Sequence, residues 1–147
     1  MGKKNILIFS TALIIVILDQ LTKLLIRKNF KLNESIPAIK NFFHLTYVQN
    51  TGSAFSLFQG FNIFFIIFSI IVIGIIFYYI RKIKQNEKLM QLAIGLLLGG
   101  TIGNLLDRIF IGAVTDFIDF RIWPVFNIAD SAVTISVVLL IILMWEK

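Results

Sequence analysis

Four long apolar runs, separated by shorter polar stretches, dominate the pattern of this chain. The runs cover residues 5–26, 61–80, 89–110 and 126–145. Each approaches the roughly 20 residues that a helix needs to cross the hydrocarbon core of a bilayer. The first run follows a basic start, but it is long, and Asp19 and Lys23 interrupt it, so we interpret it as an uncleaved span. We predict an all-α membrane protein with four transmembrane helices, in which residues 1–147 form a single integral domain.

The stretch between the first and second runs lacks this pattern. Apolar and polar side chains alternate over much of residues 43–48, which predicts a strand, and the sequence around Asn50 and Gly52 is typical of a turn. We predict a small extramembrane β element at about residues 42–60, lying on the bilayer surface, where its aromatic side chains suit the interface. Residues 111–125, between the third and fourth runs, are predicted to be a loop.

The rarer residue types exclude several chemistries. Cysteine is absent and His44 is the single histidine. The lack of cysteine excludes disulfides, thiolate metal sites and a cysteine nucleophile. A serine triad would need His44, but no G-x-S-x-G motif accompanies it, and an H-E-x-x-H zinc motif is absent as well. We therefore expect no metal site.

The basic residues gather at the ends of the apolar runs and give a net charge of +6. Anionic lipid head groups are the usual partners of such residues, so we expect membrane lipids and no nucleic acid as partners. Four spans place both termini on one side. Lysine and arginine are equally numerous on the two sides, but residues 81–88 hold four of them in a short loop, and short loops weigh most in the positive-inside rule. The termini are therefore predicted to be cytoplasmic, with the segments 27–60 and 111–125 facing outward.

Four aspartates fall near the outer ends of these spans: Asp19, Asp107, Asp116 and Asp130. A carboxylate at membrane depth is costly, so each is a candidate functional residue. We select Asp116 and Asp130 as the candidate catalytic pair, because two carboxylates that share one proton can divide acid and base work. The alternative is structural, since Asp130 or Asn127 could cap the start of the fourth helix.

Other polar residues are candidates for supporting roles. Asn104 and Arg108 lie one helical turn apart on one face, where Arg108 could hold a carboxylate or a lipid phosphate. The alternative is an ion pair between Asp107 and Arg108 that fixes helix packing. Asp19 and Lys23 are also one turn apart, and we interpret them as a structural ion pair. Small residues that let helices approach closely recur every four positions, at Gly95, Gly99 and Gly103.

Five short blocks of these residues occur in a particular order. They are DQLTK (19–23), NTGSAF (50–55), GGTIGNLLDR (99–108), VTDFIDF (114–120) and FNIADS (126–131). In these blocks and their order, on four predicted spans, the chain resembles lipoprotein signal peptidase, the type II signal peptidase family of bacteria. One small departure is Thr115, where many members carry valine.

The resemblance implies an aspartyl endopeptidase of the bacterial cytoplasmic (inner) membrane, with its active site near the outer face. Such an enzyme removes the signal peptide from lipid-modified prolipoproteins, cutting just before the diacylglyceryl cysteine, and needs no cofactor. By this resemblance Asp116 and Asp130 are the catalytic dyad, and the segment 42–60 includes a mobile lid. We expect a monomer. The candidate residues that bind substrate or support the dyad are Asp19, Lys23, Asn50, Gly52, Asn104, Asp107, Arg108 and Asn127.

Two other functions are compatible with parts of this pattern. A proton- or ion-translocating subunit also uses intramembrane carboxylates, but it should carry them across the full bilayer depth, whereas here they gather at one side and the second span has none. A scaffold that binds other membrane proteins through its glycine faces would not need Asp116 or Asp130.

Overall fold

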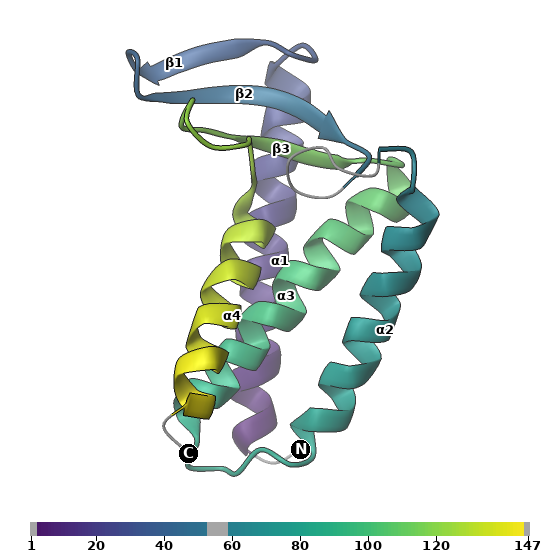
Figure 1. Ribbon diagram of the computed structural model, residues 1–147, viewed down its shortest axis with the longest axis vertical. Coiled ribbons are helices and arrows are strands. Elements are labelled where there is room, and N and C mark those ends of the chain that lie inside the picture. The colour runs from purple at the N-terminus through teal and green to yellow at the C-terminus, as the bar shows by residue number, and fades with distance from the viewer. Residues whose placement is uncertain (1–2, 53–58, 146–147) are drawn as a thin grey trace.

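Four long helices run side by side in the computed structural model, which describes residues 3–52 and 59–145 (Figure 1). Each is long and apolar enough to cross a membrane, which confirms the prediction of four spans. The helices are α1 (Lys3–Asn29), α2 (Asn62–Ile80), α3 (Lys88–Phe110) and α4 (Ile128–Trp145). The beginning of α1 and the end of α4 lie together at one end of the bundle, as four spans require.

Several helix boundaries differ from the prediction by one to three residues. The first helix continues three residues past the expected end, to Asn29. The fourth begins two residues later than expected, at Ile128, because Asn127 caps it. The Asn127 Oδ1 accepts a hydrogen bond from the backbone N–H of Asp130 at 2.8 Å, and the Asp130 Oδ2 accepts one from the backbone N–H of Asn127 at 3.3 Å. This reciprocal pair is a capping box, so the structural alternative for these two residues is confirmed.

The third helix is the centre of the bundle and packs against α1, α2 and α4. Its glycines make this packing possible. A Cβ atom added at Gly95 would lie 2.7 Å from the Thr11 Cβ of α1, and one added at Gly100 would lie 2.5 Å from the Ala129 carbonyl oxygen of α4. Both distances are far inside van der Waals contact, so the interpretation of the glycine repeat as a packing surface is confirmed.

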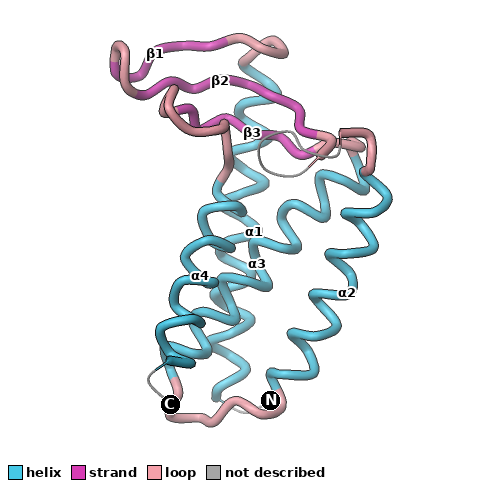
Figure 2. Tube along the Cα trace, in the orientation of Figure 1, coloured by secondary structure: helices cyan, strands magenta, loops and turns pink. Residues whose placement is uncertain are grey.

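A three-stranded antiparallel sheet crosses one end of the bundle (Figure 2). Its strands, in spatial order, are β1 (Ser35–Ile39), β2 (Phe43–Asn50) and β3 (Val114–Asp119). The predicted β element at 42–60 is therefore only partly right. The sheet begins earlier, at Ser35, and part of the predicted element, residues 53–58, lies outside the described residues.

The prediction that residues 111–125 form a loop is wrong for its central part, because β3 lies there. All but one of the β3 residues are buried, so the strand lacks the alternation that marks a sheet with one wet face. The strand β1 was not predicted, for a different reason. It is an exposed edge strand that contains Pro37, and proline lowers strand propensity although an edge tolerates it.

Candidate active site

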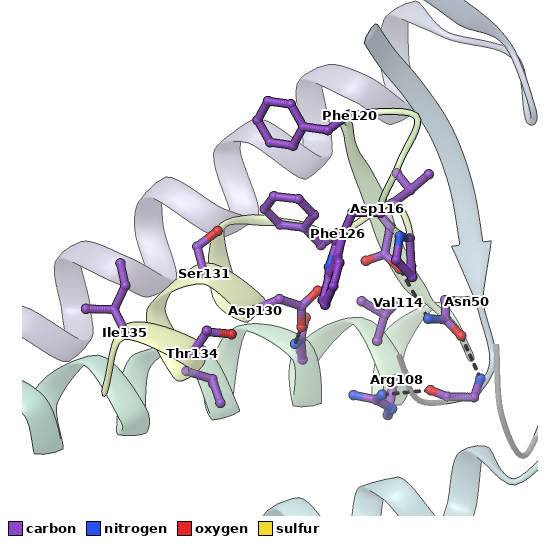
Figure 3. Close-up of a pocket in the computed structure, with 16 residues that line it drawn as sticks. Asn50, Arg108, Val114, Asp116, Phe120, Phe126, Asp130, Ser131, Thr134 and Ile135 are labelled. Atoms are coloured by element: carbon purple, nitrogen blue, oxygen red, sulfur yellow. Dashed lines mark hydrogen bonds between the residues drawn. The ribbon is translucent and has the colours of Figure 1, made fainter. Parts of the chain in front are cut away.

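A pocket of about 560 Å³ opens where α3, α4 and the sheet meet (Figure 3). Asp116 of β3 and Asp130 of α4 both line it. The other polar residues predicted for the site that line it are Asn50, Gly52, Asn104 and Arg108. The segment that leads from β3 to α4 supplies an apolar wall, which consists of Phe120, Trp123, Pro124, Val125 and Phe126.

The carboxyl group of Asp116 is almost completely buried, with 2% of the residue exposed. Its Oδ1 accepts a hydrogen bond from the Asn127 side-chain amide at 2.7 Å, and its Oδ2 accepts one from the Asn50 side-chain amide at 3.2 Å. Burial, together with the negative charge of Asp130, raises the pKa of Asp116 to about 7. This carboxyl group can therefore hold or release a proton near neutral pH.

Asp130 occupies the first turn of α4, where the helix dipole favours a negative charge. Its Oδ1 accepts a hydrogen bond from the Asn104 side-chain amide at 2.8 Å, while its Oδ2 faces the backbone N–H of Asn127 in the capping box. Asn127, which caps α4, therefore also contacts both carboxyl groups of the pocket, through its side chain to Asp116 and through its backbone to Asp130.

At the mouth of the pocket, Asn50, Gly52 and Arg108 are linked. The Asn50 Oδ1 accepts the backbone N–H of Gly52 at 2.9 Å, which confirms the predicted turn, while the Asn50 amide reaches Asp116. The Arg108 Nη2 donates to the Gly52 carbonyl at 3.2 Å, and the guanidinium group lies 5.1 Å from the centre of the Phe65 ring. Arg108 therefore presents a positive charge to the pocket.

A cluster of buried charges lies behind the pocket, between α1, α3 and β3. The Lys23 Nζ lies 2.8 Å from the Asp19 Oδ2 and 3.5 Å from the Asp107 Oδ2, and all three side chains are fully buried. The predicted pair of Asp19 and Lys23 is confirmed. The suggested ion pair of Asp107 with Arg108 is wrong, since Asp107 pairs with Lys23 and Arg27 instead, at 3.5 Å and 3.4 Å.

Hydrogen bonds connect this charged cluster to the two aspartates of the pocket. Lys23 donates to the Asn104 Oδ1 at 2.9 Å, which turns the amide N–H group of Asn104 towards Asp130. Asp19 accepts the backbone N–H of Ala129 at 3.0 Å, at the start of α4. Asp107 accepts the backbone N–H of Thr115 at 2.8 Å, next to Asp116. The cluster therefore holds in place the backbone next to Asp116 and Asp130.

The sequence analysis assigned no role to three residues that take part in this network: Gln20, Arg27 and Thr115. Gln20 donates to Asp107 at 3.1 Å, and Arg27 donates to the Thr115 hydroxyl at 3.0 Å. Gln20 belongs to the first of the five blocks, and Arg27 lies one helical turn beyond Lys23, so both carried a recognisable signal. Thr115 contributes a hydroxyl group that accepts this hydrogen bond from Arg27.

The pocket offers acid and base groups surrounded by amide donors. One carboxyl group has a pKa of about 7, and a second stands at a helix N-terminus, an arrangement that suits general acid–base work on a water molecule. Among residues 3–52 and 59–145, no three His, Asp or Glu side chains gather as they would to hold a metal ion.

Comparison with known proteins decides between the remaining functions. The family model described as signal peptidase (SPase) II matches residues 11–146. The chain belongs to the signal peptidase II family. Members of this family are aspartic peptidases, and this chain is one that removes the signal peptides of prolipoproteins.

Similar proteins cover nearly the whole chain. The lipoprotein signal peptidase of Halothermothrix orenii is 46% identical over 141 residues, which cover 96% of this chain and 97% of that protein. The lipoprotein signal peptidase of Desulfitobacterium hafniense is 52% identical over 139 residues, covering 94% and 92%. A solved structure described as a bacterial membrane enzyme has a TM-score of 0.90 at 39% identity, covering 95% of this chain and 87% of that chain. This signal peptidase II is therefore a bacterial membrane enzyme.

Proposed function

We propose that Asp116 and Asp130 are the catalytic dyad, and that the enzyme cuts prolipoproteins immediately before a cysteine that already carries a diacylglyceryl group. The observation that carries the dyad is the shared pocket, since one carboxyl group from β3 and one from α4 border the same cavity. The Asp116 pKa of about 7, raised in part by the charge of Asp130, further supports a functional pair.

The reaction divides between the two carboxyl groups. The two carboxyl groups share one proton at rest, and Asp116, whose pKa is raised to about 7, holds it. Asp130 takes a proton from water as the water oxygen attacks the scissile carbonyl carbon, and Asp116 donates its proton to the carbonyl oxygen. When the resulting diol collapses, the C–N bond breaks, Asp130 passes its proton to the departing amine nitrogen, and Asp116 recovers a proton from the diol.

The neighbouring residues divide into two groups. Asn50, Asn104 and Asn127 orient the carboxyl groups through their side-chain amides. Arg108, beside the carbonyl of Gly52, faces the substrate backbone at the mouth of the pocket. Behind them, the buried charged cluster of Asp19, Lys23 and Asp107 holds α1, α3, α4 and β3 in register and does not touch the substrate.

The apolar wall of the pocket supports a substrate that is itself embedded in lipid. Most of the pocket surface comes from apolar side chains, among them Phe120, Trp123 and Phe126. The signal peptide and the lipid chains of a prolipoprotein are apolar, so they match this wall. We place the termini in the cytoplasm and the dyad near the outer face of the cytoplasmic membrane, in a monomer that works without a cofactor.

The test is cleavage of a synthetic prolipoprotein peptide by purified enzyme in detergent, with the products identified by mass spectrometry. We expect cleavage just before the diacylglyceryl cysteine, and none of the same peptide without the lipid. Asp116→Asn should abolish cleavage. The matched control is Glu34→Gln, a carboxyl-to-amide change at a residue that does not line the pocket.

Two outcomes would refute parts of the proposal. Equal cleavage of the unmodified peptide, or a cut at another bond, would refute the assigned substrate. Wild-type rates in Asp116→Asn would refute the dyad while leaving the peptidase activity intact.

A further inference from the structure

A second cluster of polar side chains lies on the sheet, outside the pocket. We call it the outer polar cluster, and it consists of Ser35, His44, Thr46, Asp119 and Arg121. These residues come from β1, from β2 and from the end of β3 with the residues that follow it. None of them lines the pocket, and the proposed reaction makes no use of them.

Asp119 is the buried member of the outer polar cluster, with 5% of the residue exposed. Its Oδ2 accepts the Thr46 hydroxyl at 2.7 Å, and its Oδ1 accepts the backbone N–H of Arg121 at 2.8 Å. Burial alone would raise the pKa of Asp119, but the hydrogen bonds from Thr46 and Arg121, with the positive charge of Arg121, hold that pKa below its usual value. The carboxylate is therefore ionised and committed to these partners at neutral pH.

Arg121 reaches across the sheet to both other strands. Its Nη2 lies 2.9 Å from the Ser35 hydroxyl and 2.6 Å from the His44 Nδ1. A guanidinium group has donors and no acceptor, so the His44 Nδ1 must accept this bond and carry no proton. The backbone of Arg121 adopts a positive φ of 67°, which side chains other than glycine rarely favour.

The segment that these contacts hold is the apolar wall of the pocket. Residues 119–125 leave the sheet at Asp119 and return at Phe126, whose backbone exchanges two hydrogen bonds with Ile118 at 2.8 Å and 3.1 Å. Between these two points lie the pocket-lining residues Trp123 and Pro124. Because Arg121 bonds this segment to Ser35 of β1 and His44 of β2, these contacts help to set the position of the wall.

We propose that Asp119 and Arg121 are positioning residues of the peptidase, which fasten the segment 119–125 to β1 and β2. The inference rests on the proposed function, because it takes the pocket of Asp116 and Asp130 as the substrate site. Neither residue touches the reacting atoms. Their effect falls on substrate binding, through the wall that carries Trp123.

The first test separates substrate binding from chemistry by measuring KM and kcat with the diacylglyceryl peptide. Arg121→Met should raise KM about fivefold, the effect of losing roughly one net hydrogen bond, with kcat changed by less than about twofold. Arg121→Lys keeps the charge and one donor, and should recover part of the loss. A fall in kcat at unchanged KM, beside an active wild type, would overturn the positioning role and leave the proposed function intact.

A spectroscopic reading keeps the inference testable without turnover. The chain has two tryptophans, and Trp145 lies at the end of α4, so Trp145→Phe leaves Trp123 as the single reporter. Its fluorescence should shift when Arg121→Met is added, because the wall that carries Trp123 loses its contacts with β1 and β2. Identical spectra with and without Arg121 would overturn the proposal, whatever the enzyme cleaves.

Discussion

The buried charged cluster gives the sharpest prediction about stability, through the change Lys23→Met. The Lys23 ammonium group is fully buried, 2.8 Å from Asp19 and 3.5 Å from Asp107. Methionine keeps much of the side-chain volume but leaves two buried carboxylates without this charge. Breaking a buried ion pair by removing one partner costs about 3–5 kcal/mol. At about 2–4 °C per kcal/mol for a chain of this size, the melting temperature should fall by about 10 °C.

Thermal unfolding in one fixed detergent measures this effect, with Arg27→Met as the matched control. Arg27 also pairs with Asp107, at 3.4 Å, but its side chain is 22% exposed, so water screens the pair and its loss should cost about 1 kcal/mol or less. The double variant Lys23→Met with Asp19→Asn should recover part of the lost stability, since one uncompensated charge is gone. Equal melting temperatures for Lys23→Met and Arg27→Met would refute the reasoning.

Three further predictions concern the pocket and the packing around it. The pKa of Asp116 is raised to about 7, so its contribution to stability is fully present below the unfolded-state pKa and is lost as the pH rises through 7. Unfolding measured over a pH series should show this loss in the wild type and not in Asp116→Asn. The kcat of the wild type should also fall above about pH 7. Asn127→Ala should lower kcat by about 100-fold and stability by about 1 kcal/mol, as measured by cleavage and unfolding; an unchanged kcat would refute its contact with the dyad. Gly103→Ala places a Cβ 2.6 Å from an oxygen of Asp19, whereas the Cβ of Gly74→Ala meets nothing within 4 Å. Thermal unfolding should therefore show a loss of stability, of about 1–3 kcal/mol, in Gly103→Ala only.

The spans and part of the site were predictable from sequence because their signals are local. Run length alone reveals a transmembrane helix, and a spacing of four residues brings Asp19 and Lys23 together on α1. From the sequence, a helix cap and part of a polar site were alternative interpretations of Asn127 and Asp130. In the structure both are present, since the capping box itself orients the candidate catalytic carboxylate.

The features that could not be predicted depend on contacts between distant segments. The strand that carries Asp116 is buried on both faces and shows no alternation. The partners of Asp107 come from α1 and from the backbone of Thr115, 8 residues along the chain, and no spacing rule links them. From the sequence, the neighbouring Arg108 was therefore an equally plausible ion-pair partner of Asp107. In the structure the helix turns it towards the pocket and turns Asp107 away from it.

The most direct test of the central claim is single-turnover cleavage of the diacylglyceryl peptide by wild type, Asp116→Asn and Asp130→Asn, side by side at one pH, with folding checked by thermal unfolding. We predict that the wild type releases the intact signal peptide and that each folded variant releases none, because neither carboxyl group can replace the other. Cleavage at the wild-type rate by either folded variant would contradict the dyad.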